Sequence, residues 1–196
     1  ARAGILGGVP ALNYRSHDEF RGALKDIRSQ TDRAFAVNLI VHSQYNPRLE
    51  EDFEACIEYE VPALITAFGT PASLIERAHE KGILVFHDAI KLKHAKKAAE
   101  AGVDAVIAVS GGAGGHAGTI SPFVLWPWFK KELDIPVIAA GGIATGAGVA
   151  GAMALGADLA YVGTRVITSP QAQGQEDYVK LILESSPEDI EYSSEV

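Results

Sequence analysis

Short apolar runs alternate along the chain with longer stretches in which apolar residues recur at helical spacing. The short runs are rich in Val, Ile and Ala, which is typical of strands buried on both faces of a parallel sheet. The pattern therefore predicts an α/β fold built from successive βα units. The predicted strands are 5–7, 35–39, 63–66, 83–87, 105–109, 137–140 and 159–162, and the predicted helices are 16–30, 47–59, 71–81, 90–101, 122–133, 145–155 and 173–185.

Local signals support these units. Ser16 followed by Glu19 is typical of a helix start, because both side chains can satisfy free N–H groups. Pro71 falls at a predicted first turn, where proline is tolerated. Segments 100–105 and 154–159 share one form, in which a helix ends at Gly and Asp precedes the next strand. This repetition is expected of stacked βα units, and we predict a single barrel domain over residues 1–196 with no second domain.

Two arrangements of such units are known, and the glycines favour one of them. A TIM (β/α)8 barrel carries its phosphate sites late in the chain, and glycine clusters follow the late predicted strands at 141–142 and 163. A doubly wound sheet would need a Gly-x-Gly-x-x-Gly turn after an early strand, and the sequence has none there. We therefore predict a barrel, with the doubly wound sheet as the alternative.

The length qualifies this prediction. A complete barrel takes about 250 residues, whereas the chain has 196. The first predicted strand is already in progress at Ile5. We therefore expect an incomplete barrel in which the first βα unit is missing, as part of a longer polypeptide.

Composition narrows the classes of partner. With 17 Lys and Arg against 25 Asp and Glu, the formal net charge is −8, which opposes binding to a phosphate backbone, so we expect no nucleic-acid partner. The single cysteine, Cys56, leaves no disulfide framework or thiolate metal site, so we expect no metal and a cytoplasmic location. No apolar run reaches the roughly 18 residues of a membrane helix, and no membrane partner is expected.

Two glycine motifs carry the first candidate chemistry. Gly141-Gly142 follows one predicted strand and Gly163-Thr164 follows the next. Glycines let backbone N–H groups approach an anion closely, and a helix start behind them adds partial positive charge. Each motif alone is explained by a tight turn, whereas the pair on neighbouring strands predicts a phosphate site.

Three further polar residues are candidates for ligand contact. The glycine-rich segment 110–118 presents His116, whose imidazole can transfer protons near neutral pH; a solvated His on a flexible loop is the alternative. Asn38 falls near a strand end, where its amide can pair with the edge of a heterocycle or cap a turn. His87, at the end of another predicted strand, is a weaker candidate and is equally explained as a packed rim residue.

These motifs together resemble those of the FMN-dependent nitronate monooxygenase family, over nearly the whole chain. The matching segments, in order, are Asn38-Leu39-Ile40, Ala113-Gly114-Gly115-His116, Ala140-Gly141-Gly142-Ile143 and Gly163-Thr164-Arg165. The resemblance implies a TIM barrel with non-covalent FMN, and a His116 that contacts the nitro group and acts as base on a neutral nitroalkane. It assigns Gly141, Gly142, Gly163 and Thr164 to the FMN phosphate, Asn38 and Gly114 to the isoalloxazine, and Tyr161 and Val162 to the lining of the cofactor site.

The reaction implied by the resemblance is oxidation of an alkyl nitronate or nitroalkane, with FMN and dioxygen, to a carbonyl compound and nitrite. The partners would be this small molecule and dioxygen, with a homodimer as a candidate assembly. Two positions depart from the family pattern: Val109 stands where many members have Gln and has no donor for the flavin, and Gly112 stands where they have Glu. The alternatives are a flavin-dependent enoyl-acyl-carrier-protein reductase using NAD(P)H, and a flavin-free phosphate-binding isomerase or aldolase.

Overall fold

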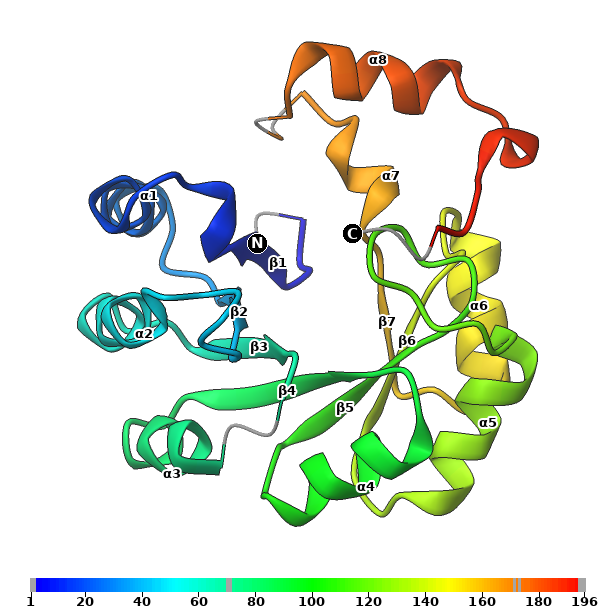
Figure 1. The fold of residues 1–196 in the computed structure, drawn as a ribbon, viewed down its shortest axis with the longest axis horizontal. Coiled ribbons are helices and arrows are strands. Elements are labelled where there is room, and N and C mark those ends of the chain that lie inside the picture. The colour runs from blue at the N-terminus through cyan, green and yellow to red at the C-terminus, as the bar shows by residue number, and fades with distance from the viewer. Residues whose placement is uncertain (1–2, 70–71, 171, 173, 194–196) are drawn as a thin grey trace.

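The computed structural model describes residues 3–69, 72–170, 172 and 174–193. In this part of the chain, seven parallel strands form one sheet in chain order, each hydrogen-bonded to the next (Figure 1). The strands are β1 (Gly7–Pro10), β2 (Phe35–Ile40), β3 (Ala63–Ala67), β4 (Leu84–Ala89), β5 (Ala105–Val109), β6 (Val137–Ala140) and β7 (Leu159–Tyr161). The α-helices are α1 (His17–Gln30), α2 (Leu49–Glu58), α3 (Ala72–Glu80), α4 (Leu92–Glu100), α5 (Pro122–Glu132), α6 (Gly146–Ala154), α7 (Thr164–Ile167) and α8 (Glu176–Glu184), and the 3-10 helices are η1 (Ala11–Asn13) and η2 (Pro187–Asp189).

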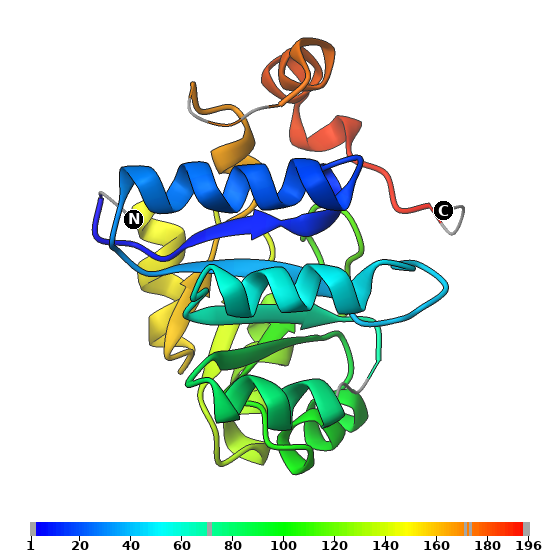
Figure 2. The same cartoon turned by 90° about the vertical axis from the view of Figure 1, so that its left-hand side faces the viewer.

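The sheet curves, and α1 to α6 cover its outer side (Figure 1). In Figure 2, α1 and α2 run side by side along the outer face of the first strands. The strand order begins at β1 and ends at β7, and these two strands do not pair with each other among the described residues. The predicted α/β fold, an incomplete TIM barrel, is confirmed.

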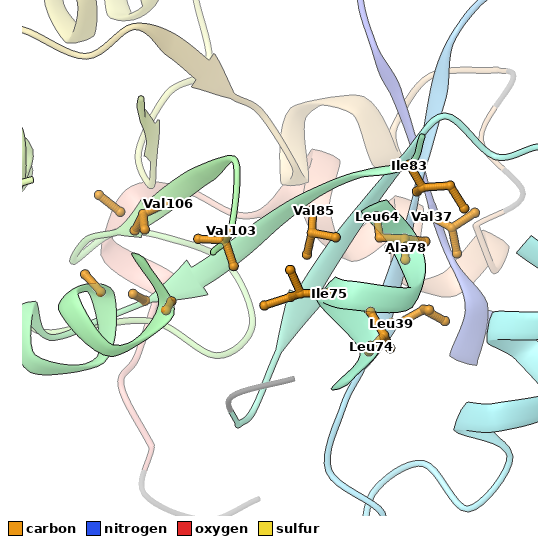
Figure 3. Packing of buried hydrophobic residues seen from close by; sticks show 14 of the residues in the cluster. Val37, Leu39, Leu64, Leu74, Ile75, Ala78, Ile83, Val85, Val103 and Val106 are labelled. Carbon is orange, nitrogen blue, oxygen red and sulfur yellow. The ribbon is translucent and has the colours of Figure 1, made fainter. Parts of the chain in front are cut away.

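The strands β2, β3, β5 and β6 are buried on both faces, and the two faces differ in the size of their side chains. On the outer face, Val37, Leu64 and Val85 belong to a large cluster that includes Leu74 and Ile75 of α3 (Figure 3). Burying a Leu, Ile or Val side chain contributes about 1.5–3 kcal/mol, so this cluster holds the helices to the sheet. The inner face carries a separate, smaller cluster made of Ala36, Ala63, Ile65, Ala105, Ile107, Val109, Ile138 and Ala140.

A buried polar network joins α2 to the start of α1 and to the segment after β1. Asp52 of α2 is fully buried. Arg48 donates from Nε to Asp52 Oδ2 at 2.8 Å and from Nη2 to the carbonyl oxygens of Ala11 and Tyr14, and His17 Nδ1 lies 3.0 Å from Asp52 Oδ1. Because every charge in the network has a partner, the cost of burying Asp52 is offset, and the first βα connection is held in place.

The strands predicted from residue 35 onwards are confirmed, whereas the first one is wrong in position. The strand is β1 (Gly7–Pro10) and not 5–7, and both Ile5 and Leu6 are exposed. The glycines and Pro10 are turn signals in the sequence, so the apolar pair before them was the stronger strand signal. In the structure Pro10 ends a strand at the edge of the described sheet, where its missing N–H is tolerated.

The seven predicted helical stretches are confirmed with small differences at their ends. Residues 71 and 173, where two of them were predicted to begin, lie outside the described residues, and this includes Pro71 as a first-turn residue. The structure adds the short helix α7 directly after Gly163, together with η1 and η2, which the sequence did not predict. Among the described residues, no helix is long and apolar enough to cross a membrane.

Candidate active site

The candidate active site is the rim where β5, β6 and β7 end. These strands are parallel neighbours, so the loops that follow them meet at one edge of the sheet. The loop after β5 spans Ser110 to Gly118, the loop after β6 begins with Gly141-Gly142, and Gly163 follows β7 closely as the N-cap of α7. The structure therefore brings the three glycine motifs to one rim, as a phosphate site would require.

The loops after β5 and β6 touch through a set of residues that we call the glycine crossing: Gly112, Ala113, Gly114, Gly141 and Gly142. The N–H of Gly142 donates to the carbonyl of Gly112 at 3.0 Å. Gly141 and Gly142 have φ of +114° and +68°, which L side chains rarely adopt. A Cβ on Gly141 would lie 2.5 Å from Ser110 Oγ and 3.1 Å from the N atom of Ala113, and a Cβ on Gly114 would collide with Thr164 Oγ1. Side chains are therefore excluded at Gly141 and Gly114, where the neighbouring loop segments approach closely.

Further hydrogen bonds hold the glycine crossing in place. Ser110 donates to the carbonyl of Ala140 twice, from its N–H at 2.9 Å and from Oγ at 2.8 Å. The N–H of Gly112 donates to Tyr192 Oη at 2.6 Å, so the segment after η2 reaches this loop. The amides of Gly112 and Gly142 are thus engaged within the chain, and a phosphate bound by either would compete with an existing hydrogen bond.

His116 lies at the same rim and is exposed. Its imidazole packs edge-on against the ring of Phe68, with ring centroids 4.9 Å apart and planes at 88°. Phe68 follows β3 with a φ of +60°, a strained conformation for a bulky residue. Tyr45 lies 5.5 Å from Phe68, and His42 lies 5.2 Å from Tyr45. These four residues, which we call the aromatic row, link the loops after β2, β3 and β5 and present a wall of rings beside His116.

The predicted ring-contacting residues divide between the two faces of the sheet. Asn38 lies two residues after Ala36, which belongs to the inner cluster, so its side chain is on the inner face. Tyr161 also faces inward, because a Cβ on Gly8 of β1 would lie 3.8 Å from Tyr161 Oη. Burial raises the pKa of Tyr161, and Asp88 adds to the increase. Val162 packs instead against the outer cluster.

Two neighbouring residues of β4 point in opposite directions. His87 is buried on the outer side, with Nδ1 2.8 Å from Thr66 Oγ1, and its pKa is lowered to about 4, chiefly by burial and also by His94 of α4. The sequence allowed two explanations for His87, contact with a ligand or packing at the rim. Its burial and its contact with Thr66 support packing. Asp88 follows on the inner face, where burial raises its pKa to about 7.

Asp88 is the site residue that the sequence analysis missed. Its Oδ1 is buried and has no hydrogen-bond partner among the described residues. The signal that could have found it is the alternation along β4, because Phe86 belongs with the inner cluster and Asp88 is two residues further on. In the sequence, the neighbouring His87 was the more conspicuous polar residue at this strand end.

The residues at this rim fit a cofactor that has both a phosphate and a planar ring. Apart from the methyl group of Ala113, the glycine crossing has no side chain to block close approach of the backbone, and the inner face offers Asn38, Asp88 and Tyr161 as polar groups for a heterocycle. The unpartnered Oδ1 of Asp88 is a further sign that a polar ligand belongs here. No cluster of three or more metal-ligating side chains occurs in the described part of the chain.

The fold and the rim define the class of protein as a barrel of the TIM type whose ligand-facing residues lie at the carboxyl ends of its strands. The sequence model of the family described as nitronate monooxygenase matches residues 1–196. The chain belongs to the nitronate monooxygenase family.

Individual relatives and solved structures agree with this membership. The chain is 32% identical to a nitronate monooxygenase of Paraburkholderia phytofirmans, over 92% of the chain and 62% of the relative. It is 33% identical to a hydroxy-methyl-oxo-octahydroindene-carboxyl-CoA dehydrogenase of Rhodococcus jostii, over 88% of the chain and 48% of the relative. The chain thus spans about half to three fifths of these relatives' length.

Two solved structures superpose closely. FabK from Thermotoga maritima has a TM-score of 0.86 and 36% identity, covering 94% of this chain and 58% of that one. A nitroalkane oxidase from Streptomyces ansochromogenes has a TM-score of 0.82 and 27% identity, covering 91% and 63%. The matched family and these relatives carry the names of oxidoreductases: a monooxygenase, a dehydrogenase and an oxidase.

We expect Gly141→Ala to destabilise the protein by about 2–4 kcal/mol, because the new Cβ meets Ser110 and backbone atoms at a positive φ. Gly151→Ala is the matched control: Gly151 is exposed within α6 with nothing near its Cβ position, so alanine should stabilise by about 0.5–1 kcal/mol. Urea unfolding followed by circular dichroism measures both changes. Equal effects of the two substitutions would contradict the close contact at the glycine crossing.

A second prediction follows from the raised pKa of Asp88. Over about pH 4 to 7 the folded protein keeps a proton on Asp88 that the unfolded chain has lost, so the contribution of Asp88 to stability falls as pH rises. Asp88→Asn, which cannot ionise, should therefore gain stability relative to wild type across this range, reaching a few kcal/mol by pH 8. Unfolding of the ligand-free proteins at several pH values gives the difference, and a difference that does not grow with pH would contradict this assignment.

Proposed function

We propose that the protein is an FMN-dependent oxidoreductase that converts an alkyl nitronate or nitroalkane, with dioxygen, to a carbonyl compound and nitrite. Family membership supports this reaction class. The observation that carries the proposal is the position of His116, which is exposed at the strand-end rim against Phe68, in the loop that contributes Gly112, Ala113 and Gly114 to the glycine crossing. A group able to move a proton and a cradle suited to a cofactor phosphate therefore lie at one rim.

In this proposal the cofactor is held from two sides. Bound FMN would supply the electron acceptor of the reaction. The glycine crossing and the start of α7 would hold the phosphate, and the inner face of the strands would meet the ring. The residues assigned to FMN are Gly141, Gly142, Gly163 and Thr164 at the phosphate, Asn38, Gly114 and Tyr161 at the ring, and Val162 in support behind Tyr161.

His116 has a separate task on each form of the substrate. A neutral nitroalkane must lose the proton on the carbon next to the nitro group, and the imidazole can accept it. A nitronate has already lost this proton, so His116 would only orient its nitro group. The edge of Phe68 restricts the orientation of the imidazole. Val109, at the end of β5, faces inward with no donor, so no side-chain hydrogen bond to FMN comes from this position.

The composition supports one further prediction about the whole protein, which concerns its location. The single cysteine, buried in α2, is compatible with a reducing compartment, so we infer a cytoplasmic location. A homodimer stays a predicted assembly.

A flavin-dependent enoyl-acyl-carrier-protein reductase using NAD(P)H is the second candidate function. The similarity to FabK, at 36% identity and a TM-score of 0.86, is the observation that favours it. Both candidates need the same glycine crossing and flavin. They differ in the substrate that reduces the flavin, and this difference can be measured directly.

The full-length protein should be yellow, with an absorbance band at about 450 nm from bound FMN. It should consume oxygen and release nitrite when an alkyl nitronate is added. Rapid oxidation of NAD(P)H driven by an enoyl thioester, with no response to nitronate, would favour the reductase. A colourless protein that cannot be reconstituted with FMN would contradict both and favour a flavin-free phosphate-binding barrel.

The role of His116 can be separated by comparing the two forms of one substrate. We expect His116→Gln to lower kcat/KM for a neutral nitroalkane by about 100-fold or more, because the base is lost. The loss for the preformed nitronate should be much smaller, because no proton has to be removed. His94→Gln, on the exposed side of α4, is the matched control and should leave both values unchanged. Equal losses on the two substrate forms would argue against His116 as the base.

A further inference from the structure

The carboxyl group of Asp88 is unusual because it is buried and lacks a full set of polar partners among the described residues. Its Oδ1 is buried without a hydrogen-bond partner among the described residues, and in the described part of the chain no basic side chain forms an ion pair with it. A buried polar group without a partner destabilises the folded protein, and most buried polar atoms in proteins are satisfied. A polar partner at this position is therefore expected from outside the chain.

The position of Asp88 in the sheet limits what that partner can be. Asp88 pairs in register with Ile107 of β5, which belongs to the inner cluster, so the carboxyl lies on the ligand-facing side. The glycine crossing is built on the ends of β5 and β6, whereas Asp88 is on β4. A carboxyl is also a poor neighbour for a phosphate, because two negative charges repel each other. The partner is therefore a neutral part of the ligand.

We propose that the protonated carboxyl of Asp88 donates a hydrogen bond to an acceptor atom, a carbonyl oxygen or a ring nitrogen, of the flavin ring. The inference rests on the flavin of the proposed function and adds a residue that neither the motifs nor the family resemblance assigned. Asp88 then acts as a binding group for the ring, separate from the glycines that hold the phosphate.

The surroundings of Asp88 keep this proton in place near neutral pH. Tyr161 is the titratable group that faces it from β7, and this phenol is neutral in the working range because its own pKa is raised. His87 on the same strand is packed on the outer side, and its electrostatic neighbour His94 is on α4. Since burial raises the pKa of Asp88 to about 7, its protonated form is available to donate.

Riboflavin is used as the probe of ring binding, because it has the ring of FMN but no phosphate that titrates. Its Kd is measured by fluorescence quenching with the full-length protein stripped of cofactor, at about pH 5.5 and about pH 8.5. We expect wild type to bind riboflavin about tenfold more weakly at the higher pH, because the donor proton is lost. Asp88→Asn keeps a donor and should bind with the same Kd at both pH values, close to wild type at the lower one. Asp88→Leu has no donor and should bind about tenfold more weakly at both.

The controls separate a local effect from a general one. Asp26→Asn makes the same chemical change on the exposed side of α1 and should behave as wild type. For every variant, the change in Kd should be the same factor for FMN as for riboflavin, because the effect is on the ring. Circular dichroism shows whether Asp88→Leu is folded, and Asp88→Asn carries the test if it is not.

Three results would overturn the proposal, and they differ in what else they affect. If wild type binds riboflavin with the same Kd at both pH values, the proton of Asp88 takes no part in binding the ring. An effect of Asp88→Leu on FMN but not on riboflavin would place Asp88 at the phosphate. Failure of wild type to bind either flavin would refute the flavin of the proposed function together with this inference, whereas the first two results leave that function intact.

Discussion

Each central strand of this sheet has to bury side chains on two faces that meet different partners. The outer face packs against helices and is filled by branched residues such as Leu64 and Val85. The inner face is filled largely by Ala and Ile and is shared with the few polar groups that a ligand would need. Because side chains alternate along a strand, a single residue of register decides which group supports the helices and which faces the ligand. The placement of Asn38, Asp88 and Tyr161 depends on this constraint.

The sequence predicted the central strands and the helices because each is a long, continuous signal. It could not predict β1, whose Gly7-Gly8 and Pro10 are typical of turns, and which is a strand only because Phe35 to Asn38 pairs with it. It also could not decide the faces of β4, because Leu84 to Phe86 are apolar and both His87 and Asp88 are polar, so the sequence does not show which of the two faces is the inner one. In the sequence, His87 was the candidate of the two, and the pairing with β5 in the structure shows that Asp88 is the one on the inner face.

At the rim, too, only part of the site could be predicted from the sequence. The glycine motifs were found in the sequence because consecutive glycines are conspicuous, and the structure places them together. The aromatic row was not found, because Tyr45, Phe68 and His116 are far apart in the chain and follow three different strands. Tyr192 meets Gly112 across an even larger separation. Such contacts depend on the order and curvature of the strands in the sheet, which local sequence patterns do not contain.

The opposite directions of His87 and Asp88 have a consequence for the acid behaviour of the chain. Between about pH 4 and 6.5, the folded strand holds its proton on Asp88 while His87 is neutral. In the unfolded chain the ordinary pKa values reverse this, so that Asp88 is ionised and His87 carries the proton. Both states therefore bind one proton at this pair, and the two pH dependences offset each other. For these two residues, unfolding in mild acid transfers one proton from Asp88 to the preceding residue, His87, with none taken up from the solvent.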